Sequence, residues 1–248
     1  MGESLASLIR ASRACVVLTG AGVSTASGIP DFRGDHGLWS REDAMRVASI
    51  AGFRADPRGF FDFWARHLGG LARALPNDAH RVIARLEARG LVHTLITQNV
   101  DGLHSVAGSR DPLEVHGNFH RARCLTCGAR YATRSFLAEL GEGEAPTCTV
   151  CSGLVKPDVV LFGEALDPSF ERAQAATGAC DLFVAMGTSL EVAPVSDLVP
   201  SVIDRGGKVV IVNRDATPFD DDATLVLGGD LVEHMRALAQ DLAIDLSR

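Results

Sequence analysis

The chain has 248 residues, of which 46% are hydrophobic and 22% charged, and its formal net charge is -7 at pH 7. This length suits one large α/β domain, alone or with a small insertion, and the composition argues against both a mini-protein and a disordered chain. The acidic balance gives no electrostatic reason to bind nucleic acid and makes a basic peptide the more natural partner. The longest apolar stretches fall far short of the roughly 20 residues that span a bilayer.

The N-terminal segment, residues 1–13, carries charges on both sides of a short amphipathic pattern and lacks the apolar core of a secretory signal. Six cysteines in such a chain indicate metal binding or redox chemistry before disulfides, because reducing compartments keep thiols free. We therefore expect a cytoplasmic protein that has neither a membrane nor a nucleic acid as a direct partner.

Short β-branched runs alternate with helical patterns along the chain, an arrangement typical of a parallel sheet. A buried strand is expected at residues 14–19 and breaks at Gly20. Apolar residues then recur at helical spacing, namely Phe60, Phe63, Trp64, Leu68 and Leu71. Asn77 and Asp78 supply cap chemistry for a second helix, which is expected to run through Arg89 and to end at Gly90.

Further strands are expected at residues 91–97, 113–116, 159–162, 182–186 and 209–212, and helices at about 168–176, 194–205 and 230–243. Most of these strands end at a polar or glycine-rich motif. Ligands of open α/β sheets bind beyond the carboxyl ends of the strands, so the site should be assembled from these motifs. The alternation of strand and helix patterns stops between residues 118 and 155, where Cys, Gly, Arg and Thr dominate. We interpret this segment as an inserted module.

Four cysteines form two closely spaced pairs, Cys124 with Cys127 and Cys148 with Cys151. The spacing predicts a zinc ribbon, in which two knuckles each present two thiolates to a tetrahedral ion. With four protein ligands the ion has no open position for water, so it would stabilise the fold and perform no chemistry. Unrelated thiols or a redox pair are the alternative, and paired spacing of this kind seldom arises from either.

A glycine-rich loop follows the first expected strand directly, where glycines let the backbone approach a pyrophosphate. Gly20 and Gly22 alone are a weak signal, because Thr25 replaces the third glycine of the usual dinucleotide fingerprint and no acidic residue clearly ends the second strand. An ordinary dehydrogenase is therefore a poor fit. Arg33 could supply a fixed charge for phosphate or ribose and Phe32 a face to cover a ring, but Arg33 could equally pair with surface carboxylates.

Several longer blocks of the sequence resemble sirtuin motifs and occur in the sirtuin order. They are residues 20–34 (GAGVSTASGIPDFRG), 97–104 (TQNVDGLH), His116-Gly117, the two cysteine pairs, 156–164 (KPDVVLFGE) and 187–194 (GTSLEVAP). The similarity extends from about residue 5 to about residue 240. The chain thus resembles a compact bacterial-type sirtuin core.

The resemblance implies a Rossmann-type parallel sheet with helices on both faces plus a small inserted zinc-ribbon domain. The NAD-binding domain would comprise residues 1–34, 76–117 and 156–248, while residues 35–75 and 118–155 would form the helical and zinc-ribbon parts of the small domain. NAD would be the co-substrate and one Zn²⁺ a structural ion. An acetylated-lysine protein or peptide would lie in the cleft between the domains.

The same resemblance assigns residues to each ligand. NAD would be bound by Gly20, Ala21, Gly22, Thr25, Phe32, Arg33, Gln98, Asn99, Val100, Asp101, His116, Gly187, Thr188, Ser189, Asn213, Arg214 and Asp230. The peptide would contact Val159, Val160, Phe162, Gly163 and Glu164, which could pair with its main chain by strand addition. His116 and Asn99 would be the catalytic residues.

The implied reaction begins when the amide oxygen of the acyl-lysine attacks the nicotinamide ribose, which expels nicotinamide and leaves an alkylimidate. His116 resembles the family's general base and would help to deprotonate a ribose hydroxyl, which then attacks the imidate. The products are free lysine and acyl-ADP-ribose. A neutral imidazole, with an ordinary pKa of about 6.5, can accept a proton at physiological pH.

Sirtuins that prefer succinyl or malonyl lysine carry a Tyr and an Arg, three residues apart, on the helix that follows the first loop. This chain has Trp64 and His67 there. Without the cationic fork that recognises a carboxylate, we expect removal of acetyl groups, or of other apolar acyl groups, rather than of succinyl or malonyl groups. Simple core packing of Trp64 is an equally good explanation of that residue.

Three other functions remain open on the sequence. The same activation of NAD could serve mono-ADP-ribosyl transfer to a protein nucleophile. A zinc-ribbon binding module is a non-enzymatic alternative, although it leaves His116 and Asn99 unexplained and lacks the basic patch that nucleic acid requires. A dehydrogenase would produce reduced nicotinamide, whereas a deacylase would release free nicotinamide.

Overall fold

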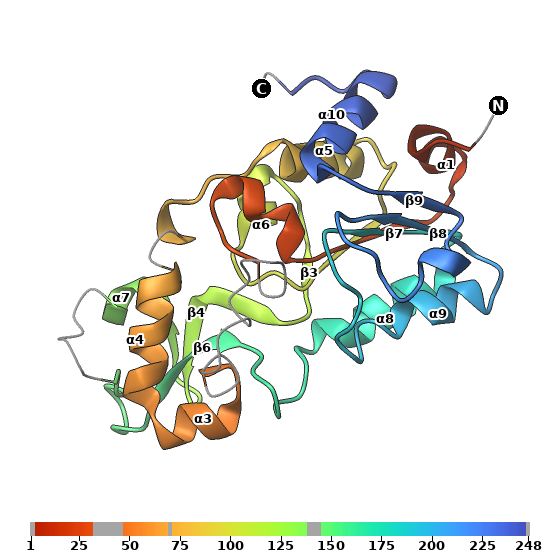
Figure 1. Cartoon of the computed structure of the whole chain (residues 1–248). Coiled ribbons are helices and arrows are strands. Elements are labelled where there is room, and N and C mark those ends of the chain that lie inside the picture. Colours follow the sequence, from red (N-terminus) through yellow and green to blue (C-terminus); the bar gives the residue numbers. More distant parts are fainter. Residues whose placement is uncertain (1–2, 32–46, 69–70, 138–144, 247–248) are drawn as a thin grey trace.

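The computed structural model describes residues 3–31, 47–68, 71–137 and 145–246, and it contains two sheets of different size (Figure 1). The larger is a parallel sheet of β1 (Cys15–Thr19), β2 (Thr94–Thr97), β3 (Leu113–Glu114), β7 (Leu182–Met186), β8 (Lys208–Val212) and β9 (Leu225–Leu227). Its strands lie in the order β3-β2-β1-β7-β8-β9. Counted along the chain within this sheet, that is the 3-2-1-4-5-6 order of dinucleotide-binding folds, so the expected Rossmann-type sheet is confirmed.

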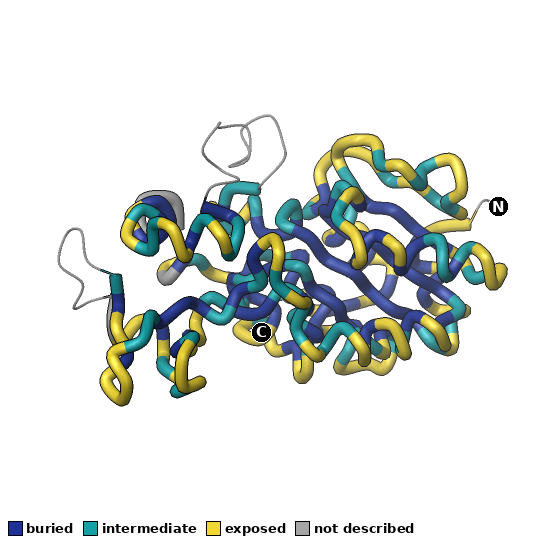
Figure 2. Tube along the Cα trace, turned by 90° about the horizontal axis from the view of Figure 1, so that it is seen from below, coloured by how far each residue is buried: buried dark blue, intermediate teal, exposed yellow. Residues whose placement is uncertain are grey.

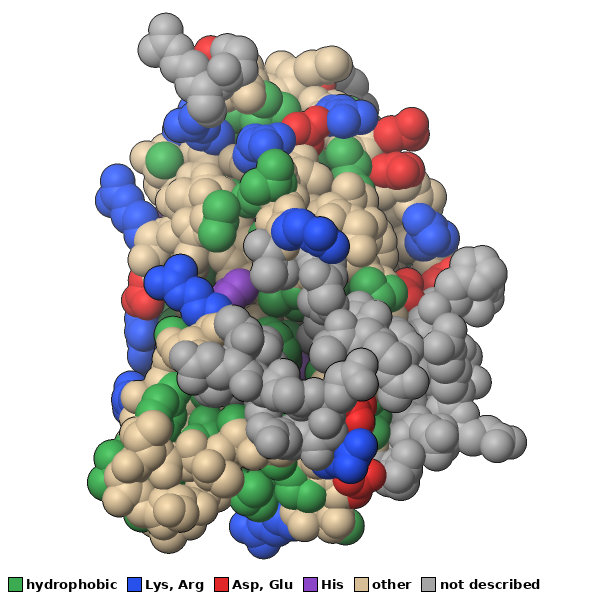
Figure 3. Space-filling view, turned by 90° about the vertical axis from the view of Figure 1, so that its left-hand side faces the viewer, with side chains coloured by type: hydrophobic (Ala, Val, Ile, Leu, Met, Phe, Trp, Pro, Cys, Tyr) green, Lys and Arg blue, Asp and Glu red, His purple; other side chains and the backbone are tan. Residues whose placement is uncertain are grey.

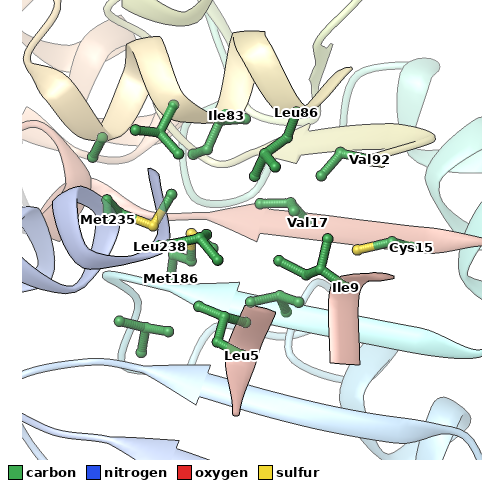
Figure 4. Packing of buried hydrophobic residues seen from close by; sticks show 14 of the residues in the cluster. Leu5, Ile9, Cys15, Val17, Ile83, Leu86, Val92, Met186, Met235 and Leu238 are labelled. Atoms are coloured by element: carbon green, nitrogen blue, oxygen red, sulfur yellow. The ribbon is translucent and has the colours of Figure 1, made fainter. Parts of the chain in front are cut away.

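The central strand β1 is buried over its whole length, because helices cover both faces of the sheet. Cys15 and Val17 point to the face covered by α1 (Leu5–Ala11), α5 (Asp78–Ala88) and α10 (Leu231–Asp241), where Figure 4 shows them packed with Ile83, Leu86 and Met235. Val16 and Leu18 point to the other face, toward α8 (Ser169–Ala179) and α9 (Leu198–Ile203). An unbroken apolar run at β1 is the consequence of this two-sided burial.

Helix starts follow the cap chemistry of the sequence. Asn77 caps α5, accepting the N–H of Ala79 at 2.9 Å. Asp230 caps α10 by accepting the N–H groups of Val232 and Glu233 at 2.8 and 3.0 Å. Such caps are worth about 1 kcal/mol each. Gly90 follows α5 with a φ of +68°, as expected for a helix stop.

The smaller sheet is antiparallel, in the order β5-β4-β6, and consists of β4 (Gly117–Cys124), β5 (Arg130–Ala132) and β6 (Val155–Val159). Near it lie α3 (Ile50–Ala55), α4 (Pro57–Leu68) and α7 (Thr133–Leu137). Aromatic rings of α3 and α4 pack edge to face, with the centroids of Phe53 and Phe60 4.9 Å apart. Burial of a ring of this size contributes roughly 1.5–3 kcal/mol. Figure 2 shows this part at one end of the molecule, beside the dark-blue strands of the large sheet.

Short elements complete the described chain: α6 (Leu103–Ala107) and the 3-10 turns Ala21–Val23, Thr25–Ser27, Leu71–Arg73 and Asp220–Asp222. Within the described ranges, no helix combines the length and the apolar character needed to cross a membrane.

Two expected strands need correction. The strand expected at residues 159–162 is wrong, because β4 pairs with residues 155–159 instead. Pro157 is tolerated within β6 because β6 is an edge strand. The strand expected from residue 91 begins only at Thr94, since the N–H groups of Leu91 and Val92 bond back to Leu86 O and close the end of α5.

Other boundaries also differ from expectation. The third strand ends at Glu114 and not at 116, and the helix expected at 194–205 is the shorter α9, Leu198–Ile203. The sequence pattern did not predict β4, β5 or β9. The residues of β9 are only partly buried at the edge of the sheet, so they show no clear strand pattern.

Candidate active site

The glycine-rich loop meets β7 at the point where the strand order of the large sheet reverses. Gly20 N–H donates to Met186 O at 3.0 Å, and Gly22 N–H donates to Gly187 O at 2.8 Å. A Cβ on Gly22 would lie 2.8 Å from Gly187 Cα, and one on Gly20 would lie 2.7 Å from Gly187 O. Since backbone atoms cannot move aside, this contact of two loops requires glycine. The loop therefore opens the crevice where doubly wound sheets bind nucleotides.

A large cleft of about 1260 Å³ lies over these strand ends and reaches toward the small sheet. It exceeds the roughly 300–1,000 Å³ of ordinary small-molecule sites, so it has room for a dinucleotide and part of a second ligand. Most of the residues expected at the site line it: Gly20, Ala21, Gly22, Thr25, Gln98, Asn99, Val100, His116, Val159, Val160, Phe162, Gly163, Glu164, Gly187, Thr188, Ser189, Asn213, Arg214 and Asp230.

Three expected residues stand apart from that lining. Phe32 and Arg33 lie outside the described residues. Asp101 is buried, 4% exposed, and its carboxylate accepts a hydrogen bond from Ser24, which in turn contacts the cleft residue Asn99.

Polar side chains behind the cleft form one buried hydrogen-bonded network. Ser24 Oγ donates to Asp101 Oδ2 at 2.6 Å and accepts from Asn99 Nδ2 at 3.1 Å. Asn99 Nδ2 also donates to Gly20 O at 3.0 Å, which ties it to the glycine-rich loop. Because every partner is buried, the amide and the carboxylate are fixed in orientation before any ligand arrives. Ser24 received no role from the sequence, although it stands within the glycine-rich block.

Two buried histidines support this network from the side of α5 and α6. Burial lowers the pKa of His80 to about 4 and that of His104 to about 3. His104 Nε2 lies 2.9 Å from Thr19 Oγ1, and His80 Nδ1 accepts the N–H of Asn77 at 3.3 Å. Both rings are therefore neutral structural groups at physiological pH and do not compete with His116 as a base.

His116 follows β3, half-buried, where its ring borders the cleft. Its Nδ1 lies 3.2 Å from Gln98 O. A carbonyl oxygen only accepts, so Nδ1 carries the proton and Nε2 keeps a lone pair for a substrate proton. Burial lowers the pKa of His116, and the bond to Gln98 opposes that shift. The ring is therefore neutral at pH 7 and has the tautomer that a base needs.

The segment that follows β6 borders the cleft beside His116. Val160 N–H donates to His116 O at 2.8 Å. Phe162 N–H donates to Ala48 O at 2.9 Å, and Phe162 O accepts the N–H of Ile50 at 3.1 Å. Phe162 remains 40% exposed, an unusual state for a large apolar side chain. The segment is thus anchored on both sides with an apolar ring left at the cleft.

Trp64 both packs in the core of the small part and lines the cleft. It is 7% exposed, and its indole N–H donates to Val47 O at 3.4 Å. The two explanations weighed for this residue are therefore compatible. His67 lies three residues further along α4, and its side chain falls outside the described residues.

The four cysteines expected to bind zinc come together at one end of β4 and β6. Their sulfur atoms all lie within 4.8 Å of one another, and no other such cluster of metal-binding residues occurs among the described residues. Sγ of Cys124 lies 3.5 Å from that of Cys151, and Sγ of Cys127 lies 3.6 Å from that of Cys148. Four bonds of about 2.3 Å to a tetrahedral Zn²⁺ place the sulfur atoms about 3.8 Å apart. The cluster therefore fits a zinc ion.

Backbone amides stabilise the thiolates, as zinc knuckles require. Thr126 N–H donates to Cys124 Sγ at 3.3 Å and Val150 N–H to Cys148 Sγ at 3.4 Å. The only tyrosine of the chain, Tyr131, places its hydroxyl 3.0 Å from Cys148 Sγ. All four ligand positions are protein sulfurs, so the site has a structural character.

The sequence model of the Sir2 family matches residues 20–194, which include the glycine-rich loop, His116 and all four clustered cysteines. The chain belongs to the Sir2 family. The resemblance to sirtuins inferred from the sequence is thereby confirmed.

Curated Sir2 relatives are similar over nearly the whole chain. An NAD-dependent protein deacetylase of Sulfurisphaera tokodaii is 42% identical over 91% of this chain and 89% of its own length. An NAD-dependent protein deacetylase of Thermotoga maritima is 39% identical over 94% of this chain and 95% of its own length. NAD-dependent protein deacylase 2 of Archaeoglobus fulgidus is 44% identical over 87% of this chain and 85% of its own length.

Solved Sir2 structures have the same fold. One, described as a complex with a deacetylated p53 peptide and 3'-O-acetyl-ADP-ribose, has a TM-score of 0.93 at 38% identity and covers 97% of this chain and 98% of its own. A Sir2 complex with p53 peptide and NAD⁺ has a TM-score of 0.88 at 38% identity, covering 96% and 97%.

Proposed function

We propose that this Sir2-family chain removes acetyl groups from lysine side chains of proteins and transfers them to the ADP-ribose of NAD, releasing nicotinamide. NAD supplies the electrophilic ribosyl carbon and the hydroxyl that takes the acetyl group, and one water molecule from solvent is consumed when the lysine amine is released. The observation that carries the proposal is that one cleft brings together three features. They are a nucleotide crevice, a neutral His116 whose Nε2 has a lone pair, and the anchored segment 159–164, which could bind a peptide. The identity to NAD-dependent deacetylases supports it.

Each part of the cleft has its own task in this proposal. His116 accepts the proton of the ribose hydroxyl at Nε2, and Asn99, held by Ser24 and Gly20, orients the reacting ribose. Gln98, Val100 and Asp101 belong with Asn99 to the ribose and nicotinamide side. Thr25 of the glycine-rich loop contacts NAD, and we assign the same role to Phe32 and Arg33. The adenosine side is formed by Gly187, Thr188, Ser189, Asn213, Arg214 and Asp230.

The acetylated peptide lies along residues 159–164, between the two parts of the molecule. Those parts are an NAD-binding domain of residues 1–34, 76–117 and 156–248 and a small domain of residues 35–75 and 118–155, held by one structural Zn²⁺ on Cys124, Cys127, Cys148 and Cys151. Basic and acidic side chains are interspersed on the face shown in Figure 3, which favours a peptide over a nucleic acid as partner. The four cysteines of the zinc site form no disulfide, which suits the reducing cytoplasm, where we place the enzyme.

Substitution of the base tests the assignment. His116→Ala should lower kcat for deacetylation of a peptide by at least about a hundredfold, the usual contribution of a general base. His93→Ala is the matched control, because His93 precedes β2 at the opposite end of the sheet and contacts Cys15 N. Undiminished deacetylation by His116→Ala would contradict the assignment.

Trp64 and His67 also bear on the acyl group. Trp64 and His67 stand where a Tyr and an Arg would form the fork that binds a carboxylate, so kcat/KM for an acetylated peptide should exceed that for its succinylated twin by about tenfold or more. The measurement is side-by-side kinetics on the two peptides. Faster desuccinylation would show that the acyl preference is wrong while leaving the deacylase function intact.

A further inference from the structure

The chain contains 24 Lys and Arg residues, and only Lys156 and Lys208 are lysines. Lys208 is exposed in a surface ion pair, whereas Lys156, the second residue of β6, is 0% exposed. Removing an ammonium from water is costly unless all its donors find acceptors. A fully buried lysine in a chain that otherwise uses arginine therefore needs a specific reason.

The ammonium of Lys156 is enclosed by three oxygen acceptors. Nζ donates to Val159 O at 2.5 Å, to Glu164 Oε2 at 3.0 Å and to Pro157 O at 3.1 Å. Three acceptors match the three N–H donors of an ammonium, and a planar guanidinium could not converge on them. Burial lowers the pKa of Lys156, and the carboxylate of Glu164 opposes this shift.

The same glutamate shapes the chain that borders the cleft. Glu164 Oε2 accepts the N–H of Leu161 at 2.9 Å, and Glu164 N–H donates to Leu161 O at 2.9 Å. This reciprocal pair closes a turn in which Gly163 has a φ of +89°. Lys156 thus holds the start of the segment through the carbonyls of Pro157 and Val159, and its end through Glu164.

We propose that Lys156 is a positioning residue for the peptide substrate, whose buried ammonium and Glu164 hold residues 159–164 in the shape that pairs with the peptide main chain. The inference rests on the proposed function, since it takes this segment as the peptide site. Strand addition depends on backbone groups held in fixed positions, so a loosened segment loses affinity for the peptide and not for NAD.

Lys156→Met keeps the length of the side chain and removes the ammonium. We expect its Kd and KM for an acetylated peptide to rise by about tenfold, because the loosened segment must then become ordered when the peptide binds. Its Kd for NAD should stay within about twofold of the wild type. Glu164→Gln keeps the size and the acceptor for Leu161, and should raise the peptide Kd by a smaller factor of about three.

Arg123→Met is the matched control, because Arg123 faces Lys156 across the β4–β6 pair yet forms an exposed ion pair with Asp158. Its affinity for the peptide should equal that of the wild type. Fluorescence anisotropy with a labelled acetyl-peptide gives the peptide Kd, and zinc content and thermal unfolding report whether each variant is folded.

The outcomes separate the two proposals. If Lys156→Met and Glu164→Gln are folded and bind the peptide as tightly as Arg123→Met does, Lys156 has no positioning role. An equal loss of affinity for NAD and for the peptide would also overturn that role. If Lys156→Met fails to fold, the Glu164→Gln result decides. A wild type with no peptide-dependent consumption of NAD would instead contradict the proposed function.

Discussion

At the scale of single residues, His116 owes its chemistry to one backbone carbonyl and to burial. The bond from Nδ1 to Gln98 O fixes the tautomer, and burial lowers the pKa from the ordinary 6.5. In the proposed mechanism His116 acts as a base only when neutral, so we expect activity to be lost as pH falls through this lowered pKa.

A pH profile tests this electrostatic argument. The acidic limb of kcat/KM for an acetylated peptide should have its midpoint below pH 6.5, the ordinary value for histidine, and a plateau at neutral pH. The midpoint belongs to His116 if it disappears from the residual activity of His116→Ala. A midpoint above pH 7 would show that His116 is stabilised as the cation and that its environment is misjudged.

The place of a residue at the site was predictable where a sequence motif carries it, and not where the site depends on contacts between distant segments. The clustering of the four cysteines and the position of His116 at the cleft follow from spacing and family resemblance. Ser24 and Lys156 received no role, although both stand in quoted blocks, because their importance lies in contacts with Asp101 and Glu164 that only the folded chain creates.

At the scale of elements, the contact of the glycine-rich loop with the end of β7 gives a sharp prediction. Gly22→Ala would place a Cβ 2.8 Å from Gly187 Cα, so the loop must shift. We expect NAD affinity to fall by about tenfold or more, measured by calorimetry. Gly178→Ala in α8 is the matched change, because nothing lies within 4 Å of its Cβ, and it should stabilise the protein by about 0.5–1 kcal/mol. Unchanged NAD affinity in Gly22→Ala would contradict the close packing at this crevice.

The strands whose positions could be predicted are those that are buried on both faces of the sheet, because such strands appear in the sequence as unbroken apolar runs. The strand expected at 182–186 matches β7, all of whose residues are buried. The apolar run 159–162 resembled a strand equally well, yet the antiparallel partner β4 selects 155–159. Pairing between segments more than thirty residues apart is a property of the whole fold, and local periodicity does not encode it.

At the scale of the whole molecule, the two sheets differ in what holds them. The large sheet is sandwiched between two apolar clusters. At its cysteine end the small sheet rests on a compact cluster around Cys124, Cys148 and Val155, whereas Val159 at the other end of β6 joins the aromatic cluster of α3 and α4. The small cluster at the cysteine end supplies little stability by itself, so the bound zinc should contribute much of the stability there.

Removal of zinc tests this division of the molecule. The purified protein should contain one zinc ion per chain, and a strong chelator should remove it. Hydrogen exchange should then accelerate in β4, β5 and β6, while the amides of β1, β7 and β8 remain protected. Unchanged protection of the small sheet after verified loss of zinc would contradict a stabilising role for the ion.

The most direct test of the central claim is the identity of the products made from NAD and an acetylated peptide. Mass spectrometry should find free nicotinamide, O-acetyl-ADP-ribose and deacetylated peptide in equal amounts, with no reduced nicotinamide dinucleotide. ADP-ribose attached to protein without O-acetyl-ADP-ribose would instead indicate ADP-ribosyl transfer. Reduced dinucleotide beside an intact acetyl-peptide would contradict the account.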